Sequence, residues 1–210
     1  MIDPETDVAP VERARGMGVV FVAIALFAAT IALRLRVDPW LTTAGAGAIA
    51  IALSVWTLGR VHLAKLFSAQ TRHVLYAILA GIALVIATHA AYRLLPFTEV
   101  YGLYGSIAGG HPRWLLALIT FGVVVAEELV WRGVALELVK PRRLTRIGAP
   151  LAVALYVAPQ LIGGVWLLML AALGLGIVFT YQRIATRSLT PPIITHAIWS
   201  VAIFVVVPLA

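Results

Sequence analysis

The chain contains several long apolar runs, each close to the roughly 20 residues that an α-helix needs to cross a bilayer. Of its 210 residues, 62% are hydrophobic and only 12% are charged. A soluble domain usually has about a quarter of its residues charged. Because backbone polar groups find no water inside a bilayer, runs of this length are expected to be helical there. The sequence therefore predicts an all-α, polytopic membrane helical bundle.

About seven transmembrane helices are expected, and they lie at 17–33, 40–58, 74–92, 114–139, 148–161, 163–182 and 190–209. The short connections leave little chain for a second domain, so residues 17–210 are predicted to form a single membrane domain. Residues 1–16 lack an apolar core followed by a small-residue cleavage site, and we expect them to be a cytosolic tail. The Gly- and Tyr-rich segment 99–113 is expected to be an interfacial loop or a short re-entrant element.

The basic residues predict how the helices are oriented. With a cytoplasmic N-terminus, eleven of the 16 Lys and Arg residues fall in cytoplasmic segments, four in the opposite segments and one, Arg132, inside a span. Cytoplasmic loops are enriched in Lys and Arg. We therefore expect a multi-pass protein of a bacterial cytoplasmic membrane, with its C-terminus outside. The net charge of +7 is explained by loops that contact lipid headgroups, and no nucleic-acid partner is expected.

The fourth span places ionisable groups deep in the bilayer, in the sequence EELVWR (127–132). Glu128 and Arg132 are four residues apart, so they share a helix face and can form an ion pair. Glu127 is rotated by about 100° from Glu128 and is left as a spare carboxylate, which is a candidate general base. Alternatively, such a pair only holds helices together. A second glutamate in the span favours a function.

Two later spans carry further polar groups at helical spacing. In the last span, His196 and Ser200 share one face and could donate hydrogen bonds to a developing oxyanion. The alternative is a histidine that only binds a neighbouring helix. In the fifth span, Tyr156 and Gln160 have the same spacing, and Gln160 could orient a water or a substrate carbonyl.

With these motifs in order, the chain resembles the CAAX-processing and bacteriocin-processing (CPBP, or Abi) family of intramembrane proteases. The family's first motif, Glu-Glu-x-x-x-Arg, matches EELVWR. Its second, Phe-x-x-x-His, has its nearest counterpart in YVAPQ (156–160), where glutamine replaces the histidine. Its third, a His-x-x-x-Asn sequence after Ser-Leu-x-x-x-Ile, is similar to SLTPPIITHAIWS (188–200), which ends in serine. The resemblance covers about residues 114–205.

This resemblance implies an intramembrane endopeptidase that cleaves a membrane-anchored or lipidated peptide or protein by glutamate-activated water. It assigns the role of general base to Glu127, water positioning to Gln160 and oxyanion stabilisation to His196 and Ser200. Glu128, Arg132 and Tyr156 are expected to be structural or to contact substrate. The cavity is expected to be formed by the last four helices. No cofactor is expected, because zinc usually takes three protein ligands and Gln160 replaces one of them.

Two other functions are compatible with the sequence. The replacement at Gln160 suggests a catalytically inactive relative that binds a membrane peptide or partner as a chaperone, immunity or regulatory factor. A small transporter is less well supported, because the chain shows no inverted repeat and a single charged cluster. The absence of cysteine excludes a cysteine nucleophile and thiolate metal ligands.

Overall fold

A computed structural model describes residues 13–94, 102, 104–105, 110–139, 143–163 and 166–209, and within them all regular structure is helical. The α-helices are α1 (Arg13–Leu33), α2 (Pro39–Leu58), α3 (Arg60–Leu66), α4 (Thr71–Leu94), α6 (Arg113–Glu128), α7 (Ala135–Glu137), α8 (Ala149–Gly163), α9 (Trp166–Thr186) and α10 (Thr190–Val201). Wider π-helical turns cover Leu129–Val134, Leu144–Gly148 and Ala202–Val206.

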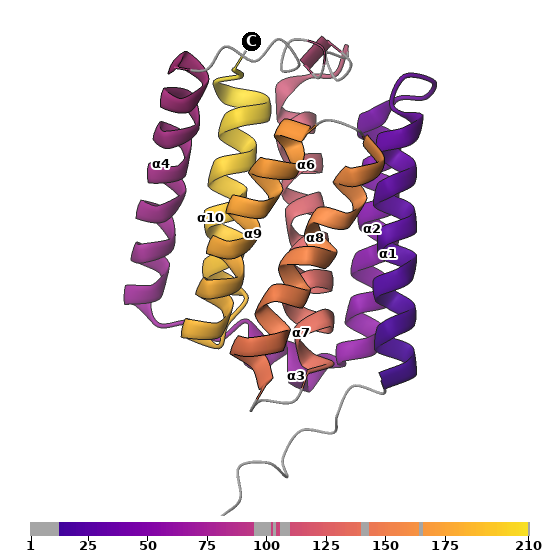
Figure 1. Cartoon of the computed structure of the whole chain (residues 1–210), viewed down its shortest axis with the longest axis vertical. Coiled ribbons are helices and arrows are strands. Elements are labelled where there is room, and N and C mark those ends of the chain that lie inside the picture. The colour runs from indigo at the N-terminus through magenta and orange to yellow at the C-terminus, as the bar shows by residue number, and fades with distance from the viewer. Residues whose placement is uncertain are drawn as a thin grey trace, which may run out of the picture.

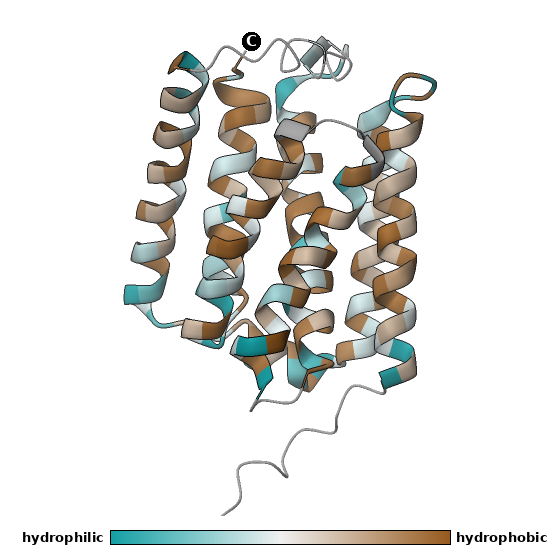
Figure 2. Ribbon diagram, viewed as in Figure 1, coloured by the Kyte–Doolittle hydropathy of each residue, from teal (hydrophilic) through white to brown (hydrophobic). Residues whose placement is uncertain are grey.

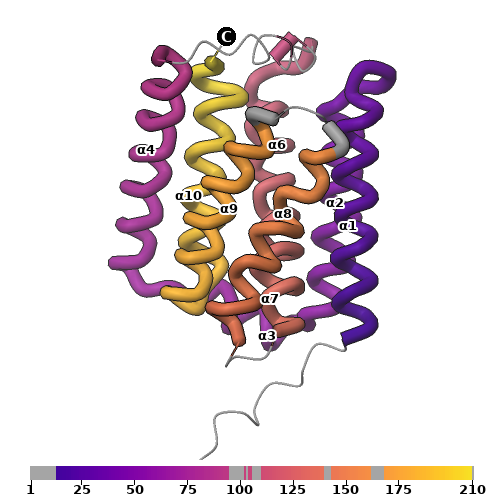
Figure 3. Tube along the Cα trace, in the orientation of Figure 1, coloured from indigo at the N-terminus to yellow at the C-terminus, as the bar shows by residue number. Residues whose placement is uncertain are grey.

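The long helices run up and down in one bundle (Figures 1 and 3), with α4 at one side and α1 and α2 at the other. Among the described residues, six helices are long and apolar enough to cross a membrane, and a shorter apolar helix at Thr190–Val206 runs beside them. These findings confirm the prediction of an all-α polytopic membrane bundle. The α1–α2 connection and the C-terminus lie at one end of the bundle, and α3 and α7 lie at the other.

Hydrophobic residues predominate along the helices of the bundle (Figure 2), and many large apolar side chains are exposed on its surface. Helix α4 shows this most clearly, because it packs mainly on α10 and leaves large apolar side chains such as Leu79 and Ile86 exposed. In water such a surface would be unfavourable, whereas lipid tails solvate it without penalty. The surface is therefore that of an integral membrane protein.

Local sequence signals set where several helices begin and end. Asp38 caps α2, since its Oδ1 accepts the backbone N–H groups of Trp40 at 2.9 Å and Leu41 at 3.0 Å. The Leu41 N–H bond and a 2.6 Å contact with His111 Nε2 hold the pKa of the Asp38 carboxyl below its usual value of 3.8. Gly59, with φ of 72°, separates α2 from α3 in a conformation that favours glycine.

The structure differs from the expected spans in a few places. Helix α1 begins at Arg13, inside the expected tail, and the short helix α3 was not predicted. Residues 1–12 and most of the segment 99–113 lie outside the described residues. Within that segment, the Tyr104 hydroxyl donates to the Ile203 carbonyl at 2.6 Å, and burial raises the pKa of Tyr104 to about 12.

Gly81 allows α4 to approach α10 closely. A Cβ atom at Gly81 would lie 2.8 Å from the Cβ of Ile198, closer than side chains pack. We expect Gly81→Ala to force the two helices apart and to lower the free energy of unfolding by about 1–3 kcal/mol, the usual cost of overpacking. Thermal unfolding in detergent measures this effect. Gly45→Ala is the matched control, because nothing lies within 4 Å of its added Cβ, and an equal loss in both variants would contradict the prediction.

Candidate active site

The first motif lies where the fourth span changes from an α-helix to a π-helix. Helix α6 ends at Glu128, and the π-helical turns of Leu129–Val134 follow directly. Within these turns, the Arg132 carbonyl accepts a hydrogen bond from Arg183 Nε at 3.2 Å. Such turns occur often at functional sites. The π-helical segment is entirely buried, so the surrounding helices hold its geometry.

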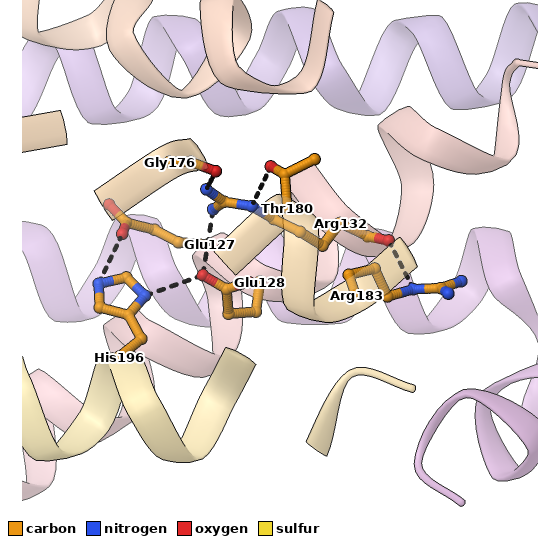
Figure 4. A network of polar contacts seen from close by, with 7 residues as sticks. All are labelled: Glu127, Glu128, Arg132, Gly176, Thr180, Arg183 and His196. Atoms are coloured by element: carbon orange, nitrogen blue, oxygen red, sulfur yellow. Dashed lines mark hydrogen bonds and ion pairs between the residues drawn. The ribbon is translucent and has the colours of Figure 1, made fainter. Parts of the chain in front are cut away.

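Arg132 connects three helices through a fully buried guanidinium (Figure 4). Its Nη1 donates to Glu128 Oε1 at 3.1 Å, which is the ion pair that the four-residue spacing predicts. Its Nε donates to Thr180 Oγ1 and its Nη2 to the Gly176 carbonyl, both at 3.3 Å. The guanidinium also lies 4.4 Å above the ring centre of Tyr156. Arg132 and Glu128 therefore form a rigid support with no exposed side-chain surface.

His196 joins the two glutamates. Its Nδ1 lies 2.9 Å from Glu128 Oε1, and its Nε2 lies 3.6 Å from Glu127 Oε2 (Figure 4). Because the Glu128 carboxylate accepts a hydrogen bond, Nδ1 carries a proton and Nε2 is directed at Glu127. The carboxylates differ in access, since the Glu127 side chain is 14% exposed and that of Glu128 is 0% exposed. Glu127 is thus the accessible member of the pair.

Aromatic rings hold the imidazole in this orientation. Phe179 stacks on His196 with ring centres 4.5 Å apart, and Tyr156 meets it edge-on at 6.1 Å. The Tyr156 phenol also lies close enough to the Glu127 carboxylate to interact with it. Sequence reasoning did not find Phe179, because an apolar ring in a hydrophobic helix carries no signal of its own.

A cavity of about 240 Å³ opens above this cluster. Glu127, Gln160, His196 and Ser200 all line it, and Tyr156 forms part of its wall. The expectation that the last four helices alone form the cavity is wrong. Helices α1 and α2 also contribute to the wall, because they pack directly against helices that carry the site. Their lining residues are Phe27, Thr30, Ile31, Pro39, Trp40 and Thr43.

A second polar cluster lies on the side of Arg132 away from the cavity. Arg183 Nη2 forms a 2.9 Å ion pair with Glu137 Oε1, and His62 Nε2 lies 3.4 Å from the other oxygen of Glu137. Sequence reasoning assigned no role to Glu137, although it lies in the same expected span as Glu127 and Glu128. It missed Arg183, whose partners Glu137 and the Arg132 carbonyl lie on another helix.

The donor groups at the site fit a zinc ion poorly. Zinc sites in enzymes usually offer three protein ligands. Here Nδ1 of His196 is already engaged by Glu128, and Gln160 offers an amide where a zinc site would use an imidazole. Within the described part of the chain, no group of three His, Cys, Asp or Glu side chains is placed to hold a metal. We therefore derive no step through a metal.

This fold and this cluster define a class: a polytopic membrane protein with a carboxylate–histidine site inside its helical bundle. Residues 109–202, from just before α6 to the end of α10, match the family described as type II CAAX prenyl endopeptidase Rce1-like. The match, which covers a little under half of the chain, confirms that this region is similar to the CPBP family. No curated protein and no solved structure matches the chain.

Proposed function

We propose that this protein is an intramembrane endopeptidase that hydrolyses a membrane-anchored or lipidated peptide or protein with a water molecule activated by Glu127. The observation that carries the proposal is the unequal placement of the two glutamates. Glu128 is completely buried and paired with Arg132, while Glu127 reaches the cavity beside His196. A general base must be reached by water, and Glu127 is the carboxylate that lines the cavity.

In the proposed reaction, Glu127 removes a proton from water as the water oxygen bonds to the carbonyl carbon of the scissile peptide. The carbonyl electron pair moves onto its oxygen, and His196 and Ser200 stabilise the resulting oxyanion. When the tetrahedral intermediate collapses, the C–N bond breaks and the proton passes from Glu127 to the leaving amine. Gln160 holds the attacking water by a hydrogen bond.

The geometry of the ring supports the role of His196. Stabilisation of the oxyanion requires a proton on Nε2, the ring nitrogen that lies 3.6 Å from Glu127 Oε2 and is not engaged by Glu128. Glu128 holds Nδ1 and thereby positions the ring, with Arg132 as its support.

The name of the matched family points to the substrate class. It describes prenyl endopeptidases, which act on lipidated substrates, and an apolar cavity inside a membrane bundle suits an anchored segment. We therefore propose a membrane-associated substrate that reaches the site from the bilayer. Tyr156 and the apolar cavity wall contact it in this proposal.

The test compares three proteins reconstituted in lipid: wild type, Gln160→His and Gln160→Leu. Each is incubated with farnesylated CAAX-type peptides and with helical membrane-anchored peptides, and products are followed by intact mass. We expect wild type to cleave, Gln160→His to cleave at least about tenfold faster, and Gln160→Leu to cleave more slowly. The reason is that a positioned acid–base group contributes about 10²–10⁴-fold, while leucine cannot hold water.

The same comparison addresses the catalytically inactive alternative that Gln160 suggests. Cleavage by Gln160→His alone would identify the natural protein as a disabled relative that binds membrane peptides. Failure of all three proteins to cleave any peptide of either set would count against the endopeptidase proposal.

A further inference from the structure

The cavity extends beyond the catalytic cluster along one face of α6. Thr120, Val123, Val124 and Glu127 all line it, and their spacing places them on a single stripe of that helix. Thr120 comes two turns before Glu127, which is about 10 Å along the axis at a rise of about 1.5 Å per residue. The side chain of Thr120 therefore faces the same cavity as the proposed general base.

Thr120 differs from the other two described threonines of the cavity wall in how its hydroxyl is used. The Thr30 hydroxyl donates to the Phe27 carbonyl at 2.8 Å, and the Thr43 hydroxyl donates to the Pro39 carbonyl at 2.6 Å. The Thr120 hydroxyl has no hydrogen-bond partner within the described part of the chain, although only 7% of the residue is exposed. Buried polar groups are usually hydrogen-bonded, because an unpaired one is unfavourable. An unpaired hydroxyl in a cavity wall is therefore a candidate contact for a ligand.

The hydroxyl of Thr120 can reach such a ligand without any movement of the backbone. Threonine in a helix uses two rotamers about its Cα–Cβ bond. Rotation between them moves the hydroxyl across the face of α6. A group that is covered in the free protein can therefore contact a bound molecule.

The neighbouring wall indicates which chemical group the hydroxyl would contact. Ile31, Ile119 and Leu168 are apolar, so a peptide that lies against them loses the water around its backbone amides. A buried backbone N–H or C=O group needs a partner, and a hydroxyl can both donate and accept. An extended peptide advances about 3.3 Å per residue, so a distance of about 10 Å corresponds to roughly three residues.

We propose that Thr120 binds the backbone of the substrate, through a hydrogen bond to the amide group of the third residue from the scissile bond. This inference rests on the proposed function, because it names how the endopeptidase holds its peptide. It requires the substrate to be extended between that residue and Glu127. A helical segment already uses its N–H groups in its own hydrogen bonds and would offer Thr120 no free donor. The site therefore takes an unwound part of a membrane-anchored or lipidated chain.

The first measurement is thermal unfolding in detergent, without peptide, of wild type, Thr120→Val and Thr120→Ser. Valine has nearly the shape of threonine without the hydroxyl, whereas serine keeps the hydroxyl. Because the hydroxyl has no partner to lose, we expect Thr120→Val to be at least as stable as wild type. A lower melting temperature for Thr120→Val than for both other proteins would show that the hydroxyl has a structural role, and it would overturn the proposal.

The second measurement is peptide binding in the Glu127→Gln background, where hydrolysis does not consume the peptide. A farnesylated CAAX-type peptide and a membrane-anchored peptide are each prepared with one backbone amide at a time replaced by an ester, which removes the N–H donor and weakens the carbonyl acceptor. The scissile bond is located with wild type by intact mass. We expect the ester at the third residue to weaken binding about two- to tenfold, the effect of one neutral hydrogen bond.

This ester effect should disappear when Thr120→Val is added and persist when Thr120→Ser is added. Thr30→Val is the matched control and should leave the ester effect as it is, because the Thr30 hydroxyl is already bonded within its own helix. An ester effect of the same size with and without the Thr120 hydroxyl would overturn the proposal. An effect that Thr120→Val removes only at another residue would also overturn it.

Failure of this inference is distinguishable from failure of the endopeptidase proposal, because binding does not require hydrolysis. An ester effect at a single amide that depends on Thr120, without cleavage of any peptide by wild type, would support binding by Thr120 and count against the endopeptidase. Cleavage by wild type without any Thr120-dependent ester effect would overturn the role of Thr120 alone.

Discussion

Glu127→Gln is expected to lower the rate of peptide hydrolysis by about 10²–10⁴-fold while leaving the folded structure intact, because a general base contributes a factor of that size. Glutamine has the size and shape of glutamate but cannot take a proton from water. The change affects the 3.6 Å contact with His196 Nε2 and the interaction with the Tyr156 phenol, whereas the ion pair with Arg132 is made by Glu128 and is retained. Initial rates in lipid, together with thermal unfolding, separate the effect on chemistry from any effect on stability.

The matched control for this prediction is Glu137→Gln, which changes a glutamate in the same span. Glu137 pairs with Arg183 on the side away from the cavity and is not among the cavity-lining residues. We expect Glu137→Gln to lower stability but to retain most of the activity of the folded fraction. If Glu127→Gln kept its activity and Glu137→Gln lost it, the assignment of the general base would be wrong.

Arg132→Met is expected to destabilise the protein by about 3–5 kcal/mol, which is the usual cost of leaving one partner of a buried ion pair uncompensated. The variant leaves the Glu128 carboxylate without its cation in a position with no exposed surface. It also removes the bonds to Thr180 and to the Gly176 carbonyl, which hold α9 against the first motif. The melting temperature in detergent and the yield of folded protein measure the loss.

The double variant Glu128→Leu/Arg132→Met tests how much of the loss of stability comes from the unpaired Glu128 charge and how much from the lost packing of Arg132. It leaves no unpaired charge, so we expect it to be more stable than Arg132→Met alone. It should nevertheless be inactive, because His196 Nδ1 loses the partner that orients the ring. Arg93→Met, at the exposed end of α4, is the control and should change stability by less than about 0.5 kcal/mol. A double variant less stable than the single one would contradict this reasoning.

The sequence was sufficient for the features that depend on local spacing. Apolar length predicts the spans, and a four-residue separation predicts the Glu128–Arg132 pair, because both follow from the geometry of a single helix. The contact between Glu128 and His196 joins positions 68 residues apart. The order of the motifs could suggest that the two residues meet, but the geometry of a single helix could not predict it.

Other parts of the site depend on how helices pack and carried no local signal. Trp40 and Thr43 line the cavity because α2 packs against α6 and α1 against α8, which a single sequence does not specify. Arg183 lies just beyond the expected span 163–182, where a cytoplasmic loop was expected, yet it is buried and donates to the Arg132 carbonyl in the π-helical segment. The Ser-Leu sequence at 188–189 contributed to the family resemblance, and its buried contact with Leu66 became evident only in the structure.

Intact-mass analysis of membrane-anchored and lipidated peptides tests hydrolysis by Glu127 directly, when they are incubated in lipid with wild type or Glu127→Gln, with and without a metal chelator. We expect wild type to cleave at one peptide bond, the chelator to leave the rate unchanged, and Glu127→Gln to produce almost no product. Equal cleavage by both proteins, or a wild-type activity that chelation abolishes and zinc restores, would contradict a glutamate-activated, metal-free endopeptidase.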